Sequence, residues 1–144
     1  VLVETEHSRR LEIGRDYDPS LPEIQGDRDQ LIQAFLNLVR NAVRAVDETD
    51  GRISLRTRAQ RKFTIGEKMH RVVMRVDVID NGPGVAAEIA DTIFFPMVTG
   101  HADGTGLGLP LAQAILNRQG GLIGFQSEPG NTIFSACLPI EVGP

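Results

Sequence analysis

The stretch RVVMRVDVIDNGPG, residues 71–84, decides how the rest of this sequence is interpreted. Its first ten residues are rich in valine and isoleucine, and their imperfect alternation with polar residues is typical of a central β-strand. Asp80 ends this strand, and Asn81-Gly82-Pro83-Gly84 then supplies the residues of a tight turn. Gly84 is free to adopt a positive φ in that turn. The stretch therefore predicts a carboxylate at the end of a buried strand, beside a glycine loop.

A carboxylate in this position has a specific chemical use and a common structural alternative. Asp80 can accept a hydrogen bond from the exocyclic amine of adenine, which guanine does not offer at the same place. Gly82 would remove side-chain bulk beside the base. The alternative is an ordinary turn, because Asn-Gly and Pro-Gly pairs are frequent turn signals.

A second glycine run, Gly104-Thr105-Gly106-Leu107-Gly108, lies downstream and precedes a predicted helix over 109–119, which Gly120-Gly121 would end. Amides near a helix N-terminus attract phosphate oxygens through their free N–H groups and the helix dipole. The run is not a P-loop, because no lysine follows the glycines, and its spacing departs from the dinucleotide fingerprint. A flexible loop without a ligand remains the open alternative.

Residues 27–47 give the clearest helical pattern, with Asp27 as the predicted N-cap and Asp29 in the first turn. An apolar face about 100° wide is expected to meet the core; it contains Ile32, Phe35, Leu36, Val39, Val43 and Val46. A polar stripe of about 80° lies opposite; it contains Gln30, Gln33, Asn37, Asn41, Arg44 and Glu48. One flank between them is filled by Ala34, Leu38, Ala42 and Ala45.

The polar stripe carries a candidate metal ligand. The amide oxygen of Asn41 is a hard oxygen ligand, which suits Mg²⁺ when phosphates and water complete its shell. Arg44, one turn further on, is placed to reach a phosphate. A solvated helix face is the alternative, but Asn37 and Asn41 lie among the apolar residues Leu38 and Ala42, which favours a functional role.

The remaining patterns set the fold class. Strands are expected at 11–17, 53–57, 71–80, 122–125 and 132–138, with turns at 66–68 and 128–131 and a short helix over 86–93. Because the strands cluster with helices on one side, we predict an α+β fold. It is a two-layer α/β sandwich with a mixed sheet covered on one face by helices, formed by residues 1–144 as one domain.

Composition excludes several classes of protein. A net charge of −4 with dispersed lysine and arginine leaves no electrostatic footprint for nucleic acid, and the basic run 56–62 is interpreted as a solvated strand end. Cys137 is the single cysteine, which excludes a disulfide framework and favours a reducing cytoplasm. No apolar stretch is long enough to span a bilayer. The chain begins at Val1, and we expect it to be a fragment of a longer protein.

Taken in order, four motifs resemble those of the GHKL (Bergerat-fold) family of ATP-binding domains. They are the N-box at 37–42, the first glycine box at 80–84, the F-box at 94–96 and the second glycine box at 104–109. Residues 130–134 and Leu138-Pro139 resemble the closing strand of that family. Within it, the sequence is similar to the catalytic domains of sensor histidine kinases. The segments 15–22 and 95–100 are similar to nitrogen-regulation kinases of the NtrB type.

This resemblance implies a role for each matching residue. Asn41 would coordinate Mg²⁺ bridging the phosphates of ATP, supported by Asn37 one turn earlier. Asp80 would select adenine, with Thr132 nearby holding a water at the base edge. Gly82 and Gly84 would line the base. The phosphates would meet the second glycine box, Gly104, Thr105, Gly106, Leu107 and Gly108, and residues 97–105 would form a lid anchored by Phe94 and Phe95.

Position 37 separates two activities. ATP-hydrolysing members of the family carry a glutamate one turn before the metal-binding asparagine, where it activates water. Asn37 is neutral and cannot act as that base, so we expect a histidine kinase. It would donate the γ-phosphate of ATP to a histidine on a separate dimerisation domain. His7, His70 and His101 lack the setting of an acceptor, so the isolated chain should not autophosphorylate.

The resemblance also implies partners: the kinase's own dimerisation and phosphoacceptor domain, a response regulator and a PII-type regulatory protein. Nucleic acid and membrane are not expected. Two other functions stay open at this point, a non-catalytic nucleotide-sensing module and a self-contained GHKL ATPase.

Overall fold

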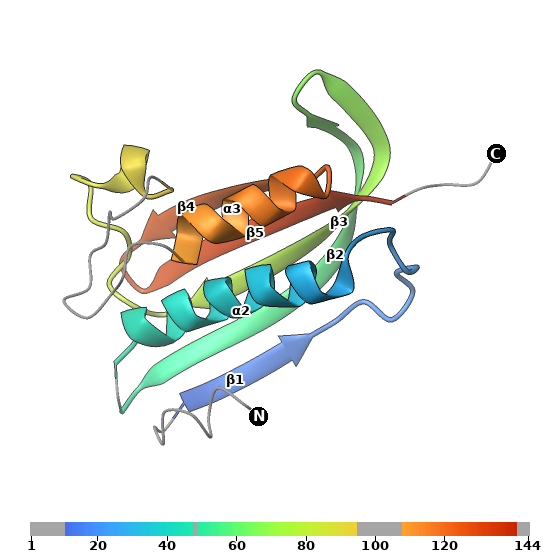
Figure 1. Ribbon diagram of the computed structural model, residues 1–144. Coiled ribbons are helices and arrows are strands. Elements are labelled where there is room, and N and C mark those ends of the chain that lie inside the picture. Colours follow the sequence, from blue (N-terminus) through green and yellow to red (C-terminus); the bar gives the residue numbers. More distant parts are fainter. Residues whose placement is uncertain (1–10, 48, 95–107, 141–144) are drawn as a thin grey trace.

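The computed structural model describes residues 11–47, 49–94 and 108–140 (Figure 1). Its elements are β1 (Leu11–Asp16), α2 (Arg28–Ala45), β2 (Gly51–Ile65), β3 (Lys68–Asp80), the 3₁₀ turn η1 (Ala90–Thr92), α3 (Gly108–Arg118), β4 (Leu122–Glu128) and β5 (Asn131–Pro139). Among the described residues, no helix combines the length and apolar character needed to cross a membrane.

The strands form one mixed sheet in the order β1-β2-β3-β5-β4. β1 and β2 are parallel, because α2 connects them as a crossover, and the other neighbours are antiparallel. Helices α2 and α3 lie side by side over one face of this sheet (Figure 1). The predicted two-layer α+β sandwich is confirmed.

The long hairpin β2–β3 extends further than the sequence predicted. Pairing runs from Ile53 opposite Asp80 to Ile65 opposite Lys68, and Gly66 turns the chain with a φ of 62°. The basic run 56–62 lies inside β2, so its expected position at a strand end is wrong, whereas its residues are half-buried or exposed, as a solvated segment requires. Pairing with β3 supplies both the ladder hydrogen bonds and a carboxylate partner that the sequence pattern of β2 alone does not reveal.

The predicted N-cap of α2 is confirmed. Asp27 has extended backbone angles, and its carboxylate accepts a hydrogen bond from the backbone N–H of Gln30 at 3.1 Å. The N–H of Asp27 itself donates to the side chain of Gln119, just past the end of α3, at 2.9 Å. The start of α2 is thereby tied to the end of its neighbouring helix.

The buried face of α2 is rotated relative to the prediction. Ala34, Leu38 and Ala42, which were expected on a flank, are fully buried, whereas Ile32 is 45% exposed. The helix contacts α3 as well as the sheet, and its buried surface is therefore centred between these two neighbours. Periodicity predicts an apolar face but does not say that two different elements cover it.

Helix α3 ends as predicted, whereas the preceding short helix is largely absent. Gly120 has a φ of 80° and its N–H donates to the carbonyl of Asn117, while the Gly121 N–H donates to the Leu116 carbonyl at 2.8 Å. This is a Schellman motif, which satisfies the last carbonyls of the helix. The helix expected over 86–93 is wrong: only η1, Ala90–Thr92, is helical, and a segment this short is below the length at which helices propagate.

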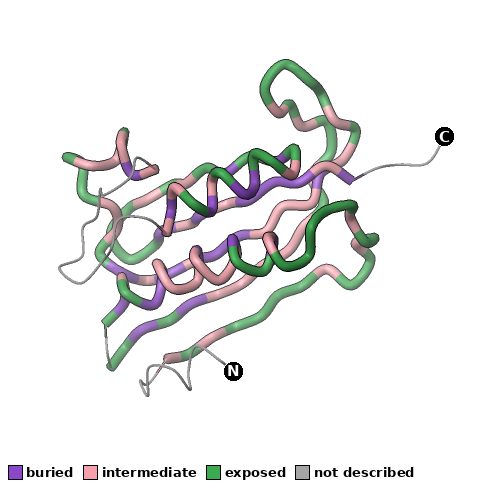
Figure 2. The backbone as a smooth tube through the Cα atoms, in the orientation of Figure 1, coloured by how far each residue is buried: buried purple, intermediate pink, exposed green. Residues whose placement is uncertain are grey.

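The core lies between the two layers, and buried residues line the facing sides of the helices and the central strands (Figure 2). Phe134 is at its centre with 1% of its surface exposed. The ring of Phe125 stacks on it at 5.5 Å, and Phe94 approaches edge-on at 6.3 Å. The expected packing of Phe94 on the core is therefore observed, and Phe95 lies outside the described residues.

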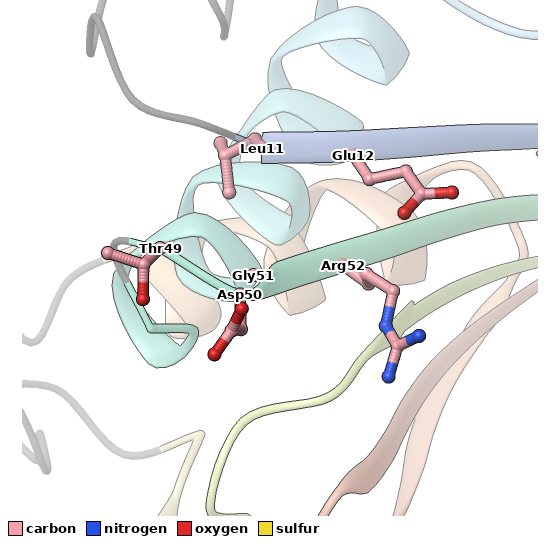
Figure 3. A pocket seen from close by; sticks show the side chains of 6 residues that line it. All are labelled: Leu11, Glu12, Thr49, Asp50, Gly51 and Arg52. Carbon is pink, nitrogen blue, oxygen red and sulfur yellow. The ribbon is translucent and has the colours of Figure 1, made fainter.

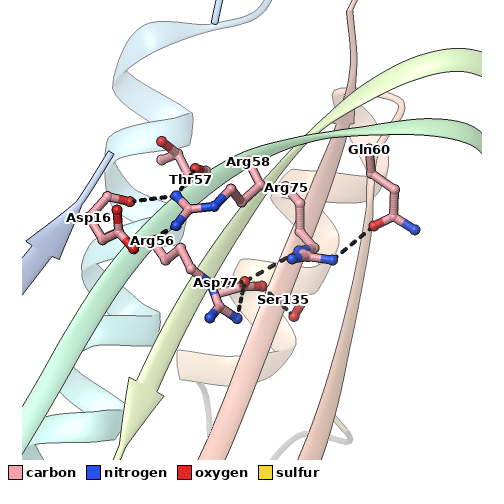
Figure 4. Close-up of polar contacts among 8 residues, drawn as sticks. All are labelled: Asp16, Arg56, Thr57, Arg58, Gln60, Arg75, Asp77 and Ser135. Atoms are coloured by element: carbon pink, nitrogen blue, oxygen red, sulfur yellow. Dashed lines mark hydrogen bonds and ion pairs between the residues drawn. The ribbon is translucent and has the colours of Figure 1, made fainter. Parts of the chain in front are cut away.

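The opposite face of the sheet carries a polar network (Figure 4). Asp77 is 1% exposed, and its carboxylate accepts hydrogen bonds from the Ser135 hydroxyl at 2.7 Å and from Nε of Arg56 at 3.0 Å. Nε of Arg75 lies 3.3 Å from the same carboxylate. Because side chains alternate along β3, Asp77 lies on the side away from the helices, while Val78 packs in the core.

Candidate functional site

Segments that are distant in the sequence meet at one end of the sandwich. The end of β3, the last turn of α2, the first turn of α3 and the β4–β5 hairpin all lie at the end shown on the left in Figure 1. Two contacts confirm this arrangement. The Gly130 N–H donates to the carbonyl of Gly82 at 2.8 Å, and Gly82 lies against the backbone of Ala45.

Asp80 is buried at this end, with 2% of its surface exposed. One carboxylate oxygen accepts a hydrogen bond from the backbone N–H of Gly82 at 2.9 Å, which turns the side chain toward the glycine loop. Thr132 is directly opposite Asp80 in the β3–β5 ladder and is 3% exposed. The expected proximity of these two residues is confirmed, and their contacts with a base remain predictions.

Packing alone explains the two glycines of the loop. A Cβ at Gly82 would lie 2.6 Å from the carbonyl oxygen of Ala45, so no side chain fits there. Gly84 has a φ of 94°, and a Cβ on it would lie 2.9 Å from the hydroxyl of Ser127. Both glycines let the loop pass between α2 and the β4–β5 hairpin. The suggestion that Gly82 clears space for a base is therefore not needed to explain it.

Asn81, which precedes Gly82 in this loop, makes structural hydrogen bonds. Its side-chain oxygen accepts from the N–H of Arg52 at 2.8 Å, and its side-chain nitrogen donates to the carbonyl of Asp50 at 2.9 Å. These bonds fasten the end of β3 to the beginning of β2.

Helix α2 carries three predicted residues, and its last turn lies at this end (Figure 1). Asn37 and Asn41 are partly buried and one turn apart, and Arg44 is exposed in the last turn. The side-chain nitrogen of Asn37 is buried and has no hydrogen-bond partner among the described residues. A buried polar group without a partner costs free energy.

Two predicted features lie largely outside the described residues. One is the second glycine box, of which Gly104, Thr105, Gly106 and Leu107 are not described; the other is Pro96 with the predicted lid, 97–105. Gly108 is described and is the first residue of α3, so the expected helix after the glycines is confirmed. A Cβ on Gly108 would meet no described atom within 4 Å.

Sequence reasoning missed Ser127. Its hydroxyl accepts a hydrogen bond from the backbone N–H of Val85 at 2.7 Å and lies 3.1 Å from the hydroxyl of Thr132. A signal was available, because the two-residue turn Pro129-Gly130 fixes the hairpin register and pairs Ser127 with Thr132.

One hollow, of about 220 Å³, reaches this site and is lined in part by Asp80, Asn81 and Gly130, whereas two larger hollows lie away from it. One of about 620 Å³ opens at the start of β1 and β2 (Figure 3), between Glu12, Asp50 and Arg52, and none of its lining residues is a predicted site residue. Another of about 280 Å³ lies on the open face of the sheet beside Arg56 and Arg75. Both are shallow surface depressions lined by charged side chains.

Comparison with known proteins assigns the family. The family described as "Histidine kinase-, DNA gyrase B-, and HSP90-like ATPase" matches residues 26–142. The chain is 46% identical over 140 residues to the "Sensory histidine kinase/phosphatase NtrB" of Proteus hauseri and 47% identical to that of Klebsiella oxytoca. In both cases the match covers 97% of this chain and 40% of the relative, so the chain spans less than half of their length.

Solved structures agree. The catalytic domain of the histidine kinase ThkA, in a nucleotide-free form, is 26% identical with a TM-score of 0.77, covering 96% of this chain and 86% of that one. Full-length ShkA in complex with AMPPNP is 28% identical with a TM-score of 0.75, covering 99% of this chain and 28% of that one. The chain therefore belongs to the family of histidine kinase-, DNA gyrase B- and HSP90-like ATPases, as an ATP-binding catalytic domain of the sensor histidine kinase type.

Proposed function

We propose that this domain, residues 1–144, binds Mg-ATP at the end of the sandwich where α2, α3 and β3 meet, and donates the γ-phosphate to a histidine on a separate dimerisation domain. The observation that carries this proposal is the convergence of Asp80, Thr132 and the last turns of α2 on one end of the fold. Such a convergence gives one ligand a base-recognising acid and phosphate-binding groups together.

Adenine recognition falls to Asp80 in this proposal. The N–H of Gly82 donates to one oxygen of the buried carboxylate and so fixes its orientation. The carboxylate then accepts a hydrogen bond from the exocyclic amine of adenine. Gly82 and Gly84 let the loop lie close to this carboxylate. Thr132, the cross-strand partner of Asp80, adds a hydroxyl group for the base edge.

The residues of α2 fit a magnesium ion that is held mostly by phosphates. The side chain of Asn41 offers a hard amide oxygen, and the described residues contain no cluster of three His, Cys, Asp or Glu side chains that would hold the ion by themselves. Mg²⁺ retains water and phosphate ligands and needs few from the protein. When bound, it neutralises charge on the phosphates. Asn37 supports Asn41 from one turn earlier, and Arg44 and the second glycine box, 104–108, bind phosphate oxygens.

The neutral residue at position 37 favours phosphoryl transfer over hydrolysis. Transfer requires positioning and charge neutralisation, which amides and a guanidinium provide, whereas hydrolysis requires a base to orient water. Asn37 offers no such base.

Similarity to NtrB proteins supports a place in nitrogen regulation. The partners proposed are the kinase's own phosphoacceptor domain, a response regulator and a PII-type regulatory protein, all in the cytoplasm. Neither nucleic acid nor a membrane is a proposed partner.

Two measurements test this function together. Calorimetry should detect ATP binding that Mg²⁺ strengthens, and Asn41→Ala should lose the Mg²⁺ dependence, whereas the control Asn117→Ala, on the exposed side of α3, should retain it. Labelled ATP should leave the chain unlabelled when it is alone and should produce phosphohistidine on an added dimerising histidine domain. Steady phosphate release without an acceptor would instead support an ATPase, and ATP binding without any transfer would support a nucleotide sensor.

A further inference from the structure

We propose that Ser127 is a positioning residue of the nucleotide site: its hydroxyl orients the hydroxyl of Thr132 so that Thr132 donates toward the purine edge, which favours adenine over 6-oxopurines. This inference rests on the proposed binding of a purine nucleotide at Asp80.

The contacts of Ser127 join three parts of the site. Ser127 is on β4 and is paired with Thr132 on β5, which is in turn paired with Asp80 on β3. Its hydroxyl also accepts the N–H of Val85, directly after the glycine loop, at 2.7 Å. A single side chain therefore connects the loop, the hairpin and the residue beside the acid.

Either hydroxyl could donate in the contact between Ser127 and Thr132, and in the proposed arrangement Ser127 donates. A backbone N–H can only donate, so the Ser127 oxygen is an acceptor toward Val85, and the proton of Ser127 is available for the Thr132 oxygen 3.1 Å away. In that chain each hydroxyl accepts one bond and donates one, and successive bonds polarise each other favourably. With Ser127 as the donor, the proton of Thr132 points away from Ser127, and in the proposed arrangement it is directed toward the purine edge beside Asp80, the cross-strand partner of Thr132.

This direction matches the edge of adenine. Adenine presents a donor at its exocyclic amine and an acceptor at N1, whereas a 6-oxopurine presents an acceptor at O6 and a donor at N1. Asp80 supplies an acceptor for the amine, and an oriented Thr132 supplies a donor for N1. Both positions are mismatched for inosine and guanine nucleotides, and mismatched buried polar groups reduce affinity.

The fold does not depend on this hydroxyl alone. The Gly130 N–H to Gly82 carbonyl bond ties the hairpin to the glycine loop through the backbone and survives a change at position 127. Replacing Ser127 therefore alters the direction of the Thr132 hydroxyl while the loop remains attached.

The experiment compares the affinities of this chain for ATP and ITP by calorimetry. We expect Ser127→Ala to lower the preference for ATP over ITP by about fivefold, as loss of one hydrogen bond implies. Ser127→Thr, which keeps a hydroxyl, should keep the wild-type preference for ATP over ITP. Ser135→Ala is the matched control: it removes a partly buried, hydrogen-bonded hydroxyl from the same hairpin on the opposite face of the sheet, and should reduce thermal stability with the preference unchanged.

The two possible failures are distinguishable. If the wild-type chain binds no ATP, the proposed function is overturned and this inference with it. If the wild-type chain binds ATP and Ser127→Ala keeps the full preference, the inference alone is overturned. Should Ser127→Ala not fold, Ser127→Cys keeps the size of the side chain with a weaker donor, and the same two outcomes apply.

Discussion

Asp80 shows how a single residue depends on its surroundings. It is buried at the end of a strand, and the N–H of Gly82 fixes one carboxylate oxygen. An asparagine has the same shape and can still accept that hydrogen bond through its side-chain oxygen. What it loses is the negative charge and the second acceptor.

Asp80→Asn should therefore fold and lose affinity for ATP. Charged hydrogen bonds are worth more than neutral ones, so we expect the dissociation constant to rise by about 10- to 100-fold. Calorimetry would measure the affinity, and circular dichroism would check the fold. The control is Asp29→Asn, an exposed residue in the first turn of α2 at the other end of the domain, which should leave the affinity unchanged. Equal affinities in all three proteins would contradict base recognition by Asp80.

At the scale of elements, β3 is held by polar contacts on its open face as well as by the core. Asp77 lies in the middle of the sheet and joins β2, through Arg56, to β5, through Ser135. By contrast, the exposed pair Arg58 and Asp16 joins β2 to β1 in solvent. The two contacts differ in burial, which determines how much each contributes.

Removing the buried carboxylate should cost far more than removing the exposed one. Asp77→Asn leaves two arginines facing an uncharged group, and we expect a loss of about 2 kcal/mol, less than for a fully buried pair because the arginines remain one-third exposed. Asp16→Asn should cost under about 1 kcal/mol. Urea unfolding of both variants would measure this difference, and equal losses would contradict it.

The end of α3 provides a second test at this scale. Gly120 has a φ of 80°, in a region that costs an alanine about 1 kcal/mol. Gly120→Ala should lower the free energy of unfolding by that amount. Gly124, on β4, has no neighbouring atom within 4 Å of a Cβ, and Gly124→Ala should change stability by less than about 0.5 kcal/mol. Thermal unfolding would measure both changes. A Gly120→Ala variant as stable as wild type would contradict the Schellman motif at the end of α3.

For the whole molecule, Cys137 reports on cooperative unfolding. It is 4% exposed, and burial raises the pKa of its thiol above the ordinary value. The folded state thus disfavours the thiolate more than the unfolded state does. This contribution to stability is present below the unfolded pKa and is lost as pH rises through the folded pKa.

Between about pH 8 and pH 10, the free energy of unfolding of the wild type should fall more than that of Cys137→Ala. Iodoacetamide should also react with the native thiol only as fast as the chain unfolds. Parallel pH dependence in both proteins, or rapid alkylation of the folded chain, would show that the thiol is accessible.

The sequence by itself determined the features that depend on neighbouring residues. These are the order of strands and helices, the N-cap at Asp27, the helix end at Gly120 and the hairpin turn at 128–131. The order of its motifs also identified the family. Each of these signals is local, because caps and turns are set by the backbone geometry of a few consecutive residues.

Tertiary structure decided the rest, since it depends on contacts between distant segments. Only the packing of α2 against both α3 and the sheet buries Ala34, Leu38 and Ala42 and exposes Ile32. The close approach of Gly82 to Ala45 explains why no side chain fits at position 82. The hydrogen bond between Ser127 and Val85 forms only once the β4–β5 hairpin has folded against the glycine loop. Periodicity within one element cannot say which neighbours will cover it, because burial is a property of the assembled fold.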